Sequence, residues 1–189
     1  MRNEDEWKKS EKMTTSPANL MVLTGDRFAC VKVTGRATFT QAVDFKALLA
    51  GLEARGYPCI VIELSECSLM DSTFLGVLAA LAARLNVANG ECETRAIELR
   101  HANARLVDLL ESLGVLHLFK MGHAETVDSG YQTVATDACR QSREDLIQAS
   151  LEAHEALMQL NPDNVGKFKE VAKFLKDDLK KLKNTKKIT

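Results

Sequence analysis

The chain has 189 residues, of which 46% are hydrophobic and 27% are charged, a composition typical of a folded rather than a disordered protein. The net charge is −1, so we expect no direct binding of nucleic acid by the molecule as a whole. No run approaches the roughly 18 apolar residues of a membrane span. The charged N-terminal segment also lacks the apolar core of a signal peptide, and we therefore expect a soluble protein of the cytoplasm.

The cysteines and histidines show no spacing typical of a metal site. Five cysteines are spread along the chain without a CxxC pair, and their odd number indicates reduced thiols. The four histidines form no HExxH motif, and no glycine-rich nucleotide loop or GxSxG elbow occurs. The sequence therefore predicts no metal, no cofactor and no catalytic residues, and we expect a protein that is not an enzyme.

The N-terminal part changes character at residue 18. Residues 1–17 are polar, and we expect a flexible arm. Two short runs of β-prone residues follow at 19–25 and 28–35, each ending in glycine. They predict two strands joined by a turn at 25–27.

Helices and strands then alternate. Residues 38–56 place apolar side chains on one helical face. The continuous apolar run at 59–62 is typical of a strand that is covered on both faces. Residues 67–70 are expected to form a loop, and a second, largely apolar helix follows to about residue 88.

The next part of the chain continues the alternation. Residues 94–102 predict a strand, 102–114 a helix and 115–121 a last short strand. The order β-β-α-β-α-β-α-β indicates an α/β domain over residues 18–122. Its sheet should be largely parallel after the opening hairpin, because helical crossovers connect parallel strands.

The C-terminal third is expected to be helical. After a linker at 123–135, residues 136–189 carry apolar side chains at spacings of 3 and 4 on both sides of a break at Asn161-Pro162-Asp163-Asn164. This pattern predicts a helical hairpin with a basic tail. Each helix has one narrow apolar stripe, so it should pack on its sibling, on the sheet domain or on a second copy as a homodimer. The lysines from Lys167 onward form either a solvated face or a site for an acidic partner, a membrane surface or nucleic acid.

Three polar residues, Asp71, Ser72 and Thr73, lie where the second predicted helix begins. A helix start has unpaired amides and a partial positive charge. One interpretation is that Asp71 or Ser72 caps the helix. The other is that Ser72 is a phosphorylation site, because a helix start stabilises the roughly −1.5 to −2 charge of a phosphate.

The stretch MDSTFLGVL at 70–78, set between an apolar strand and an amphipathic helix, resembles the signature of STAS domains. This family includes the bacterial anti-sigma factor antagonists. The resemblance extends over about residues 19–122 and includes GRATFTQAVDFKALL and HANARLVDLLESLGVLHLFKM. It implies a small mixed sheet with helices packed mainly on one face.

The resemblance also implies a partner switch. The antagonists bind an anti-sigma factor that is often also a serine kinase; the kinase phosphorylates the serine after the motif aspartate, and a phosphatase removes the phosphate. Carried over, Ser72 is the phosphoacceptor, Asp71 supports the motif and Thr73 is a secondary acceptor. The partner surface would be formed by Met70, Phe74, Leu75, Gly76, Gly35, Arg36 and Thr38.

Two alternatives stay open at this point. Phe74 stands where many antagonists have glycine, and its ring either packs into the core or faces outward and alters the choice of partner. The protein could also be a non-switching STAS subunit of a transporter ATPase or of a sensory assembly. In that case Ser72 is only a helix cap, and the hairpin makes the docking contacts.

Overall fold

The computed structural model describes residues 16–57, 59–89, 96–122, 130–134 and 141–186. The strands are β1 (Asn19–Thr24), β2 (Phe28–Ala37), β3 (Cys59–Glu63), β4 (Cys67–Met70), β5 (Ala96–Arg100), β6 (Lys120–Gly122) and β7 (Gln132–Thr133). The helices are α2 (Phe39–Ala54), α3 (Ser72–Asn89), α4 (Ala104–Ser112), α5 (Arg143–Leu160) and α6 (Val165–Lys186). Two short 3-10 helices, η1 (Leu116–Leu118) and η2 (Pro162–Asn164), complete the described elements.

The strands form one mixed sheet with the order β6-β5-β3-β2-β1-β7, and β4 pairs with the end of β2. β1 is antiparallel to β2 and to β7, whereas β2, β3, β4, β5 and β6 pair in parallel. This arrangement confirms the predicted sheet, which is largely parallel after an opening hairpin.

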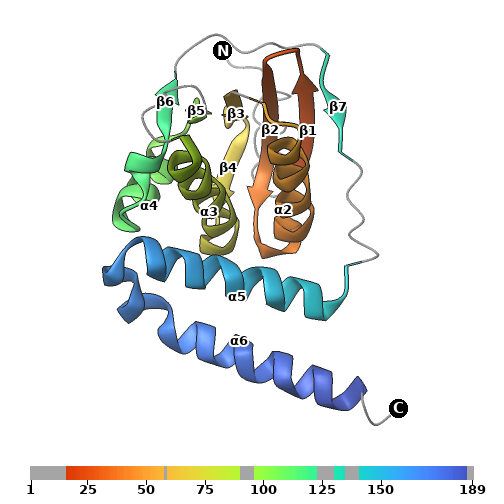
Figure 1. Cartoon of the computed structure of the whole chain (residues 1–189), viewed down its shortest axis with the longest axis vertical. Coiled ribbons are helices and arrows are strands. Elements are labelled where there is room, and N and C mark those ends of the chain that lie inside the picture. The colour runs from red at the N-terminus through yellow and green to blue at the C-terminus, as the bar shows by residue number, and fades with distance from the viewer. Residues whose placement is uncertain (1–15, 58, 90–95, 123–129, 135–140, 187–189) are drawn as a thin grey trace, which may run out of the picture.

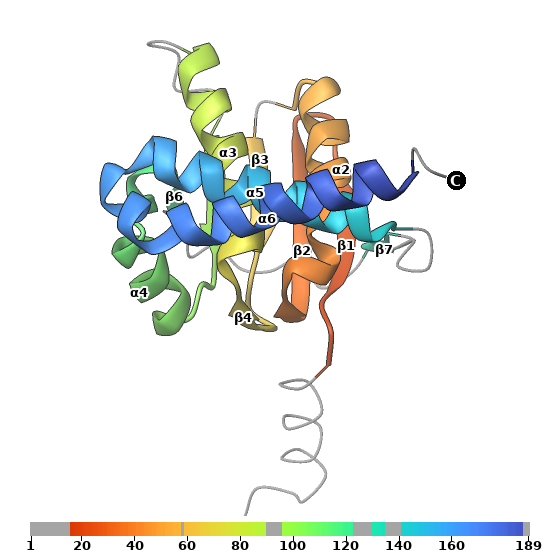
Figure 2. The same ribbon diagram turned by 90° about the horizontal axis from the view of Figure 1, so that it is seen from below.

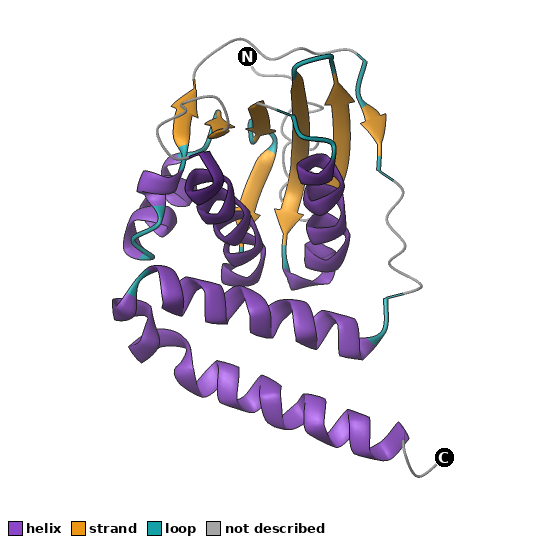
Figure 3. Ribbon diagram, in the orientation of Figure 1, coloured by secondary structure: helices purple, strands orange, loops and turns teal. Residues whose placement is uncertain are grey.

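Helices α2 and α3 lie side by side on one face of the sheet (Figures 1 and 3). The strand residues on that face alternate with those on the other, and Val31, Val33, Ile60 and Ile62 are buried against the helices. Phe45 of α2 stacks on Phe74 of α3 with 4.0 Å between the ring centroids. The α/β fold with helices mainly on one face is therefore confirmed.

Two short elements differ from the sequence prediction. Residues 67–70 form strand β4 instead of a loop, because the end of β2 offers them a parallel partner. The predicted strand at 115–121 begins instead as the 3-10 helix η1, and only Lys120–Gly122 pairs with β5. Both segments are too short for hydrophobic periodicity to decide between helix, strand and loop.

The predicted arm and linker lie mostly outside the described residues. Of the arm, Ser16 and Pro17 are described, and they pair with Arg36 at the end of β2. Of the linker, residues 130–134 are described, and two of them form β7 against β1. The sheet thus extends by one strand that was not predicted.

The C-terminal helices form the predicted hairpin. α5 crosses the lower ends of α2 and α3, and α6 lies on the far side of α5 (Figures 1 and 2). The break falls where expected, with Pro162 opening η2 and the Asn161 side chain accepting a hydrogen bond from the amide of Asp163. The apolar stripes therefore pack within the chain, on the sibling helix and on the sheet domain.

Candidate functional site

The start of α3 is capped by Asp71. Its Oδ1 accepts a hydrogen bond from the amide of Phe74 at 2.9 Å, and its backbone carbonyl accepts one from the amide of Leu75 at 3.0 Å. Ser72 is the first residue of the helix. The interpretation that Ser72 serves as the cap is therefore wrong, and its hydroxyl is available for another partner.

The same carboxylate also holds the neighbouring helix. Asp71 Oδ2 accepts a hydrogen bond from the amide of Phe39, the first residue of α2, at 2.7 Å. Its own amide donates to the carbonyl of Ala37 at 3.0 Å. β2 and β4 are parallel and end at the same edge of the sheet. Asp71 thus joins two helix starts at the carboxyl edge of the strands.

Ser72 contacts a histidine of the C-terminal hairpin. Its Oγ lies 3.0 Å from Nε2 of His154, and Nδ1 of that ring lies 2.8 Å from the carbonyl of Ser150. A carbonyl only accepts hydrogen bonds, so Nδ1 carries the proton and Nε2 accepts the hydroxyl proton of Ser72. Burial lowers the pKa of His154, although the Ser150 carbonyl and the Asp71 carboxylate oppose this shift. The neutral imidazole that this hydrogen bond needs is therefore favoured.

The next turn of α3 makes closer contacts with α5. Thr73 Oγ1 lies 3.0 Å from Oγ of Ser150. At Gly76, an added Cβ would lie 2.6 Å from the carbonyl oxygen and 2.8 Å from the Cβ of Ala153. The two helices therefore touch almost backbone to backbone, which only glycine permits at position 76.

The structure spreads the remaining predicted partner residues over different environments. Met70, Phe74 and Leu75 are each at most 2% exposed, and Phe74 adopts the core position. Gly35 and Arg36 lie in the last part of β2, not in the expected turn, and Gly35 has a φ of +72°. Of the predicted set, Arg36 is exposed and Thr38 is half-buried. In this conformation, the accessible part of the predicted surface is the one next to α2.

Sequence reasoning missed His154 and Ser150 as neighbours of the serine. They lie 82 and 77 residues from their partners Ser72 and Thr73. The periodic pattern predicts that residues 143–160 are helical, but it contains no information on which surface this helix meets. We find no signal in the sequence that would have paired these positions.

The family comparison covers the sheet domain. A sequence model for the family described as "Mlab, STAS domain" matches residues 23–120, just over half of the chain. The chain belongs to the STAS domain family. The C-terminal hairpin lies beyond the matched residues. A comparison with curated proteins finds no match.

Solved structures with a similar fold include an anti-sigma factor antagonist from Mycobacterium paratuberculosis, with 22% identity and a TM-score of 0.47 over 55% of this chain and 84% of that chain. A putative anti-sigma factor antagonist from Thermotoga maritima has 18% identity and a TM-score of 0.47 over 53% and 82% of the two chains. The antagonist SpoIIAA in its unphosphorylated form has 14% identity and a TM-score of 0.46 over 57% and 90%.

The opposite face of the STAS sheet carries a second group of polar residues. Cys30, Glu63, Arg100 and Tyr131 line a cavity there. Their polar atoms are paired within the chain: Glu63 with His101, Arg100 with Glu98, and the Cys30 thiol with the Tyr131 hydroxyl. Burial and this thiol raise the pKa of Tyr131. The group is therefore explained as a satisfied polar network.

Two general findings limit the chemistry of the described residues. Within these parts of the STAS chain, no three or more His, Cys, Asp or Glu side chains are grouped so as to hold a metal ion. No helix among them is long and apolar enough to cross a membrane. The lysines of α6 between Lys167 and Lys183 are exposed, and Lys176, Lys180 and Lys181 form ion pairs with acidic residues of the hairpin.

Proposed function

We propose that this STAS protein is a regulatory binding module of the bacterial cytoplasm, an anti-sigma factor antagonist whose partner binding is switched by phosphorylation of Ser72. The partner would be an anti-sigma factor with serine kinase activity, and a phosphatase would reset the switch. The observation that carries this proposal is the place of Ser72. It is the first residue of α3, directly after the capping Asp71, at the carboxyl edge of the parallel strands.

A helix start favours an added phosphate. The amides of the first turn point towards the N-terminal end and carry a partial positive charge, so they stabilise negative charge at that place. The capping function belongs to Asp71, and modification of Ser72 leaves the cap unchanged. The surface would then change its charge without loss of the helix, which is what a reversible switch requires.

The chemical step takes place in the partner. The oxygen of Ser72 forms a bond to the γ-phosphorus of ATP held by the kinase, and the bond from that phosphorus to the β,γ-bridging oxygen breaks. ADP leaves with the electron pair, and the hydroxyl proton passes to a base of the kinase. In the reverse step, water attacks phosphoserine, inorganic phosphate leaves and the hydroxyl is restored.

The pair of Ser72 and His154 has the distance of a nucleophile and its general base. We nevertheless infer a binding role and not an enzymatic one. The imidazole is 5% exposed, so a substrate has no approach to it in this conformation. The group that orients the ring is a backbone carbonyl, which cannot supply the negative charge that stabilises an imidazolium in a catalytic triad.

The direct test is phosphopeptide mass spectrometry on the protein purified from its own cells, across residues 67–84. We expect phosphate on Ser72 that changes with growth condition. Ser72→Ala should abolish this signal, whereas the matched Thr73→Ala should keep it. An unmodified peptide under every condition would contradict the proposal.

A second candidate function is a non-switching subunit of a transporter ATPase or a sensory assembly. The observation that favours it is that α5 lies over Ser72, whose hydroxyl already contacts His154 within the chain. The docking contacts would then come from α6, where Phe174 is 64% and Val171 42% exposed. In a pull-down from the native cells, this function predicts loss of the partner with Phe174→Ala and no change with Ser72→Asp. The switch predicts the reverse.

A further inference from the structure

The C-terminal hairpin lies directly on the surface that the proposed switch would use. His154, Ser150 and Ala153 of α5 contact Ser72, Thr73 and Gly76 in the first turns of α3. Seen from below, α5 and α6 lie in front of the helix starts (Figure 2). A protein partner of the α3 start would have to occupy the place that α5 now fills.

The docked hairpin also restricts the modification. Ser72 is half-buried, and a phosphoryl group on its Oγ would compete for space with the imidazole ring, whose Nε2 lies 3.0 Å away. A kinase would in addition need to enclose the serine together with its flanking residues, and Thr73 is only 4% exposed. Phosphorylation therefore requires that α5 first moves away from α3.

The hairpin has a small interior of its own, although Ala153 and Leu157 of α5 belong to the core of the sheet domain. This interior is formed by Leu151, Ala172 and Leu179 together with Ile147, Met158 and Leu175. It lies between α5 and α6 and stays buried when α5 leaves α3. The hairpin therefore keeps a folded interior on release.

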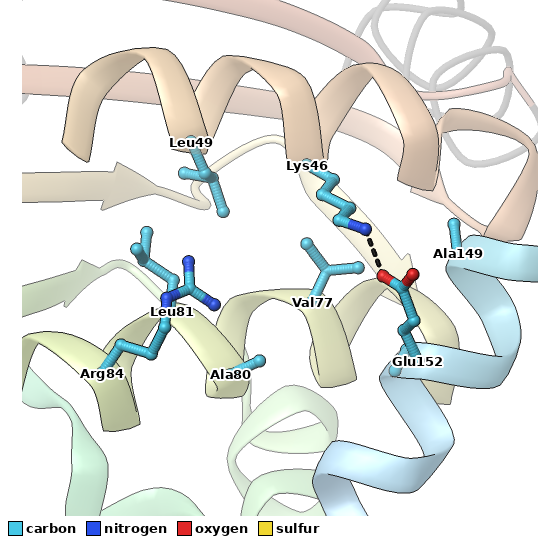
Figure 4. Close-up of a pocket in the computed structure, with 9 residues that line it drawn as sticks. Lys46, Leu49, Val77, Ala80, Leu81, Arg84, Ala149 and Glu152 are labelled. Carbon is cyan, nitrogen blue, oxygen red and sulfur yellow. Dashed lines mark hydrogen bonds and ion pairs between the residues drawn. The ribbon is translucent and has the colours of Figure 1, made fainter. Parts of the chain in front are cut away.

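The surface of α5 towards α3 consists largely of small or polar side chains. Ala149, Ser150, Ala153 and His154 provide it at the α3 start, and the large apolar side chains of Leu157 and the partly buried Leu160 follow farther along α5. Small side chains bury little apolar area, so their separation costs less free energy than that of a leucine-rich interface. A cleft remains where α5 crosses α2 and α3, and its rim carries the ion pair of Lys46 with Glu152 (Figure 4).

The other end of the hairpin has a separate attachment. The side-chain amides of Asn161 and Asn164 both donate to the carbonyl of Leu113, just after α4, at 3.2 and 2.9 Å. Lys167 donates to the carbonyl of Ser112. None of these contacts involves the α3 start, so the hairpin can lift from Ser72 while its turn stays attached to α4.

We propose that the α5–α6 hairpin is an intramolecular cover of the Ser72 surface, and that its release is the regulated step that admits both the partner and the kinase. This inference rests on the proposed role of Ser72 as the switch. The cover lowers the apparent affinity of a partner by the fraction of molecules in which it is released. A signal that favours release would activate the protein without touching the serine itself.

The test measures the accessibility of position 72 in the full-length protein, without any kinase. Ser72→Cys introduces a thiol, and its alkylation by iodoacetamide is followed by peptide mass spectrometry, with fragment ions that separate it from the native Cys59 and Cys67. Gly76→Ala is added to release the cover, because its Cβ would collide with the backbone carbonyl of Ala153. Gly51→Ala in α2 is the matched control, because a Cβ there meets nothing within 4 Å.

We expect the thiol at position 72 to be alkylated about tenfold faster in the variant with Gly76→Ala than in the variant with Gly51→Ala or in Ser72→Cys alone. The reason is that the reagent then reaches the thiol without a prior local opening of the hairpin. Cys59, which lies on the other face of the sheet, serves as the internal reference for the rate of alkylation in each sample. Amide hydrogen exchange of residues 143–160 in the Gly76→Ala variant should increase in parallel, and it shows release even where the thiol variant folds poorly.

Two results would overturn the inference. One is equally fast alkylation in all three backgrounds, which would mean that the surface is open already. The other is slow alkylation in all of them although exchange over α5 has increased, which would mean that another segment protects position 72. Neither result bears on phosphate in cells, so the inference and the proposed switch fail separately.

Discussion

The starts of α2 and α3 lie next to each other at the same edge of the sheet, yet their environments are opposite. Both follow parallel strands and both are held by the carboxylate of Asp71. Phe39 in the first turn of α2 is 48% exposed, whereas Phe74 in the first turn of α3 is fully buried. The hairpin causes part of this difference, since α5 covers the α3 start with His154 and Ser150.

The local sequence of a helix start therefore does not decide whether that start is accessible. Each start has a polar cap and a phenylalanine, but Phe74 stacks on Phe45 in the core and α5 covers the α3 start, whereas Phe39 is exposed. The open start of α2, with Arg36 and Phe39, is the part that a partner can reach while the cover is in place.

Substitution of the two phenylalanines should give the largest difference in the free energy of unfolding. Phe74→Ala removes a ring that stacks on Phe45 and should lower the free energy of unfolding by about 3 to 4 kcal/mol, because it leaves a cavity in the core. Phe39→Ala should change it by less than about 0.5 kcal/mol. Urea unfolding of both variants measures the difference, and similar losses would show that the α2 start is covered too.

Removal of the shared carboxylate should affect both starts. Asp71→Ala loses the hydrogen bonds to the amides of Phe39 and Phe74 and should cost about 2 kcal/mol. Gln41→Ala is the matched change at α2 alone, because the Gln41 side chain accepts from the amide of Thr38, and it should cost about 0.5 kcal/mol. Equal costs in urea unfolding would argue against a role of Asp71 at both helices.

The cover should weaken in mild acid. Burial lowers the pKa of His154, so the unfolded chain takes up its proton first as the pH falls below about 6.5. The stabilisation is thus present above this pH and is lost as the pH falls towards the lower, folded-state pKa. The Asp71 carboxylate faces the ring and moderates the effect. The protection factors of amide exchange over 143–160, which compare the measured with the intrinsic exchange rate at each pH, should fall between pH 7.5 and 5.5. His154→Gln should flatten this change, and an equal fall in both proteins would contradict the prediction.

The smallest effect should come from the ion pair at the rim of the cleft. The side chains of Lys46 and Glu152 are 49% and 41% exposed, and water and salt screen such pairs. Lys46→Ala should change the free energy of unfolding by no more than about 0.5 kcal/mol. A much larger loss in urea unfolding would mean that this contact, and not the α3 start, holds the hairpin in place.

The sequence predicted most of the fold because the long elements repeat their apolar residues over several turns. Residues 38–56 gave helix α2, and the apolar run at 59–62 gave β3. The errors fall on short segments, β4 and η1, where a few residues carry no period. For α5, one narrow apolar stripe was predicted, whereas the structure buries two sides of the helix because it lies between α3 and α6. Leu157 belongs to the core of the sheet domain and Leu151 to the interior of the hairpin.

The sequence alone predicted a helix start at Asp71-Ser72-Thr73 with Asp71 or Ser72 as its cap, because capping depends on residues that are neighbours along the chain. It also determined that two amphipathic helices follow the sheet domain. The tertiary structure alone decided that His154 meets Ser72 across 82 positions. An apolar stripe states that a helix must be covered, but which surface covers it depends on the shape and chemistry of the whole fold.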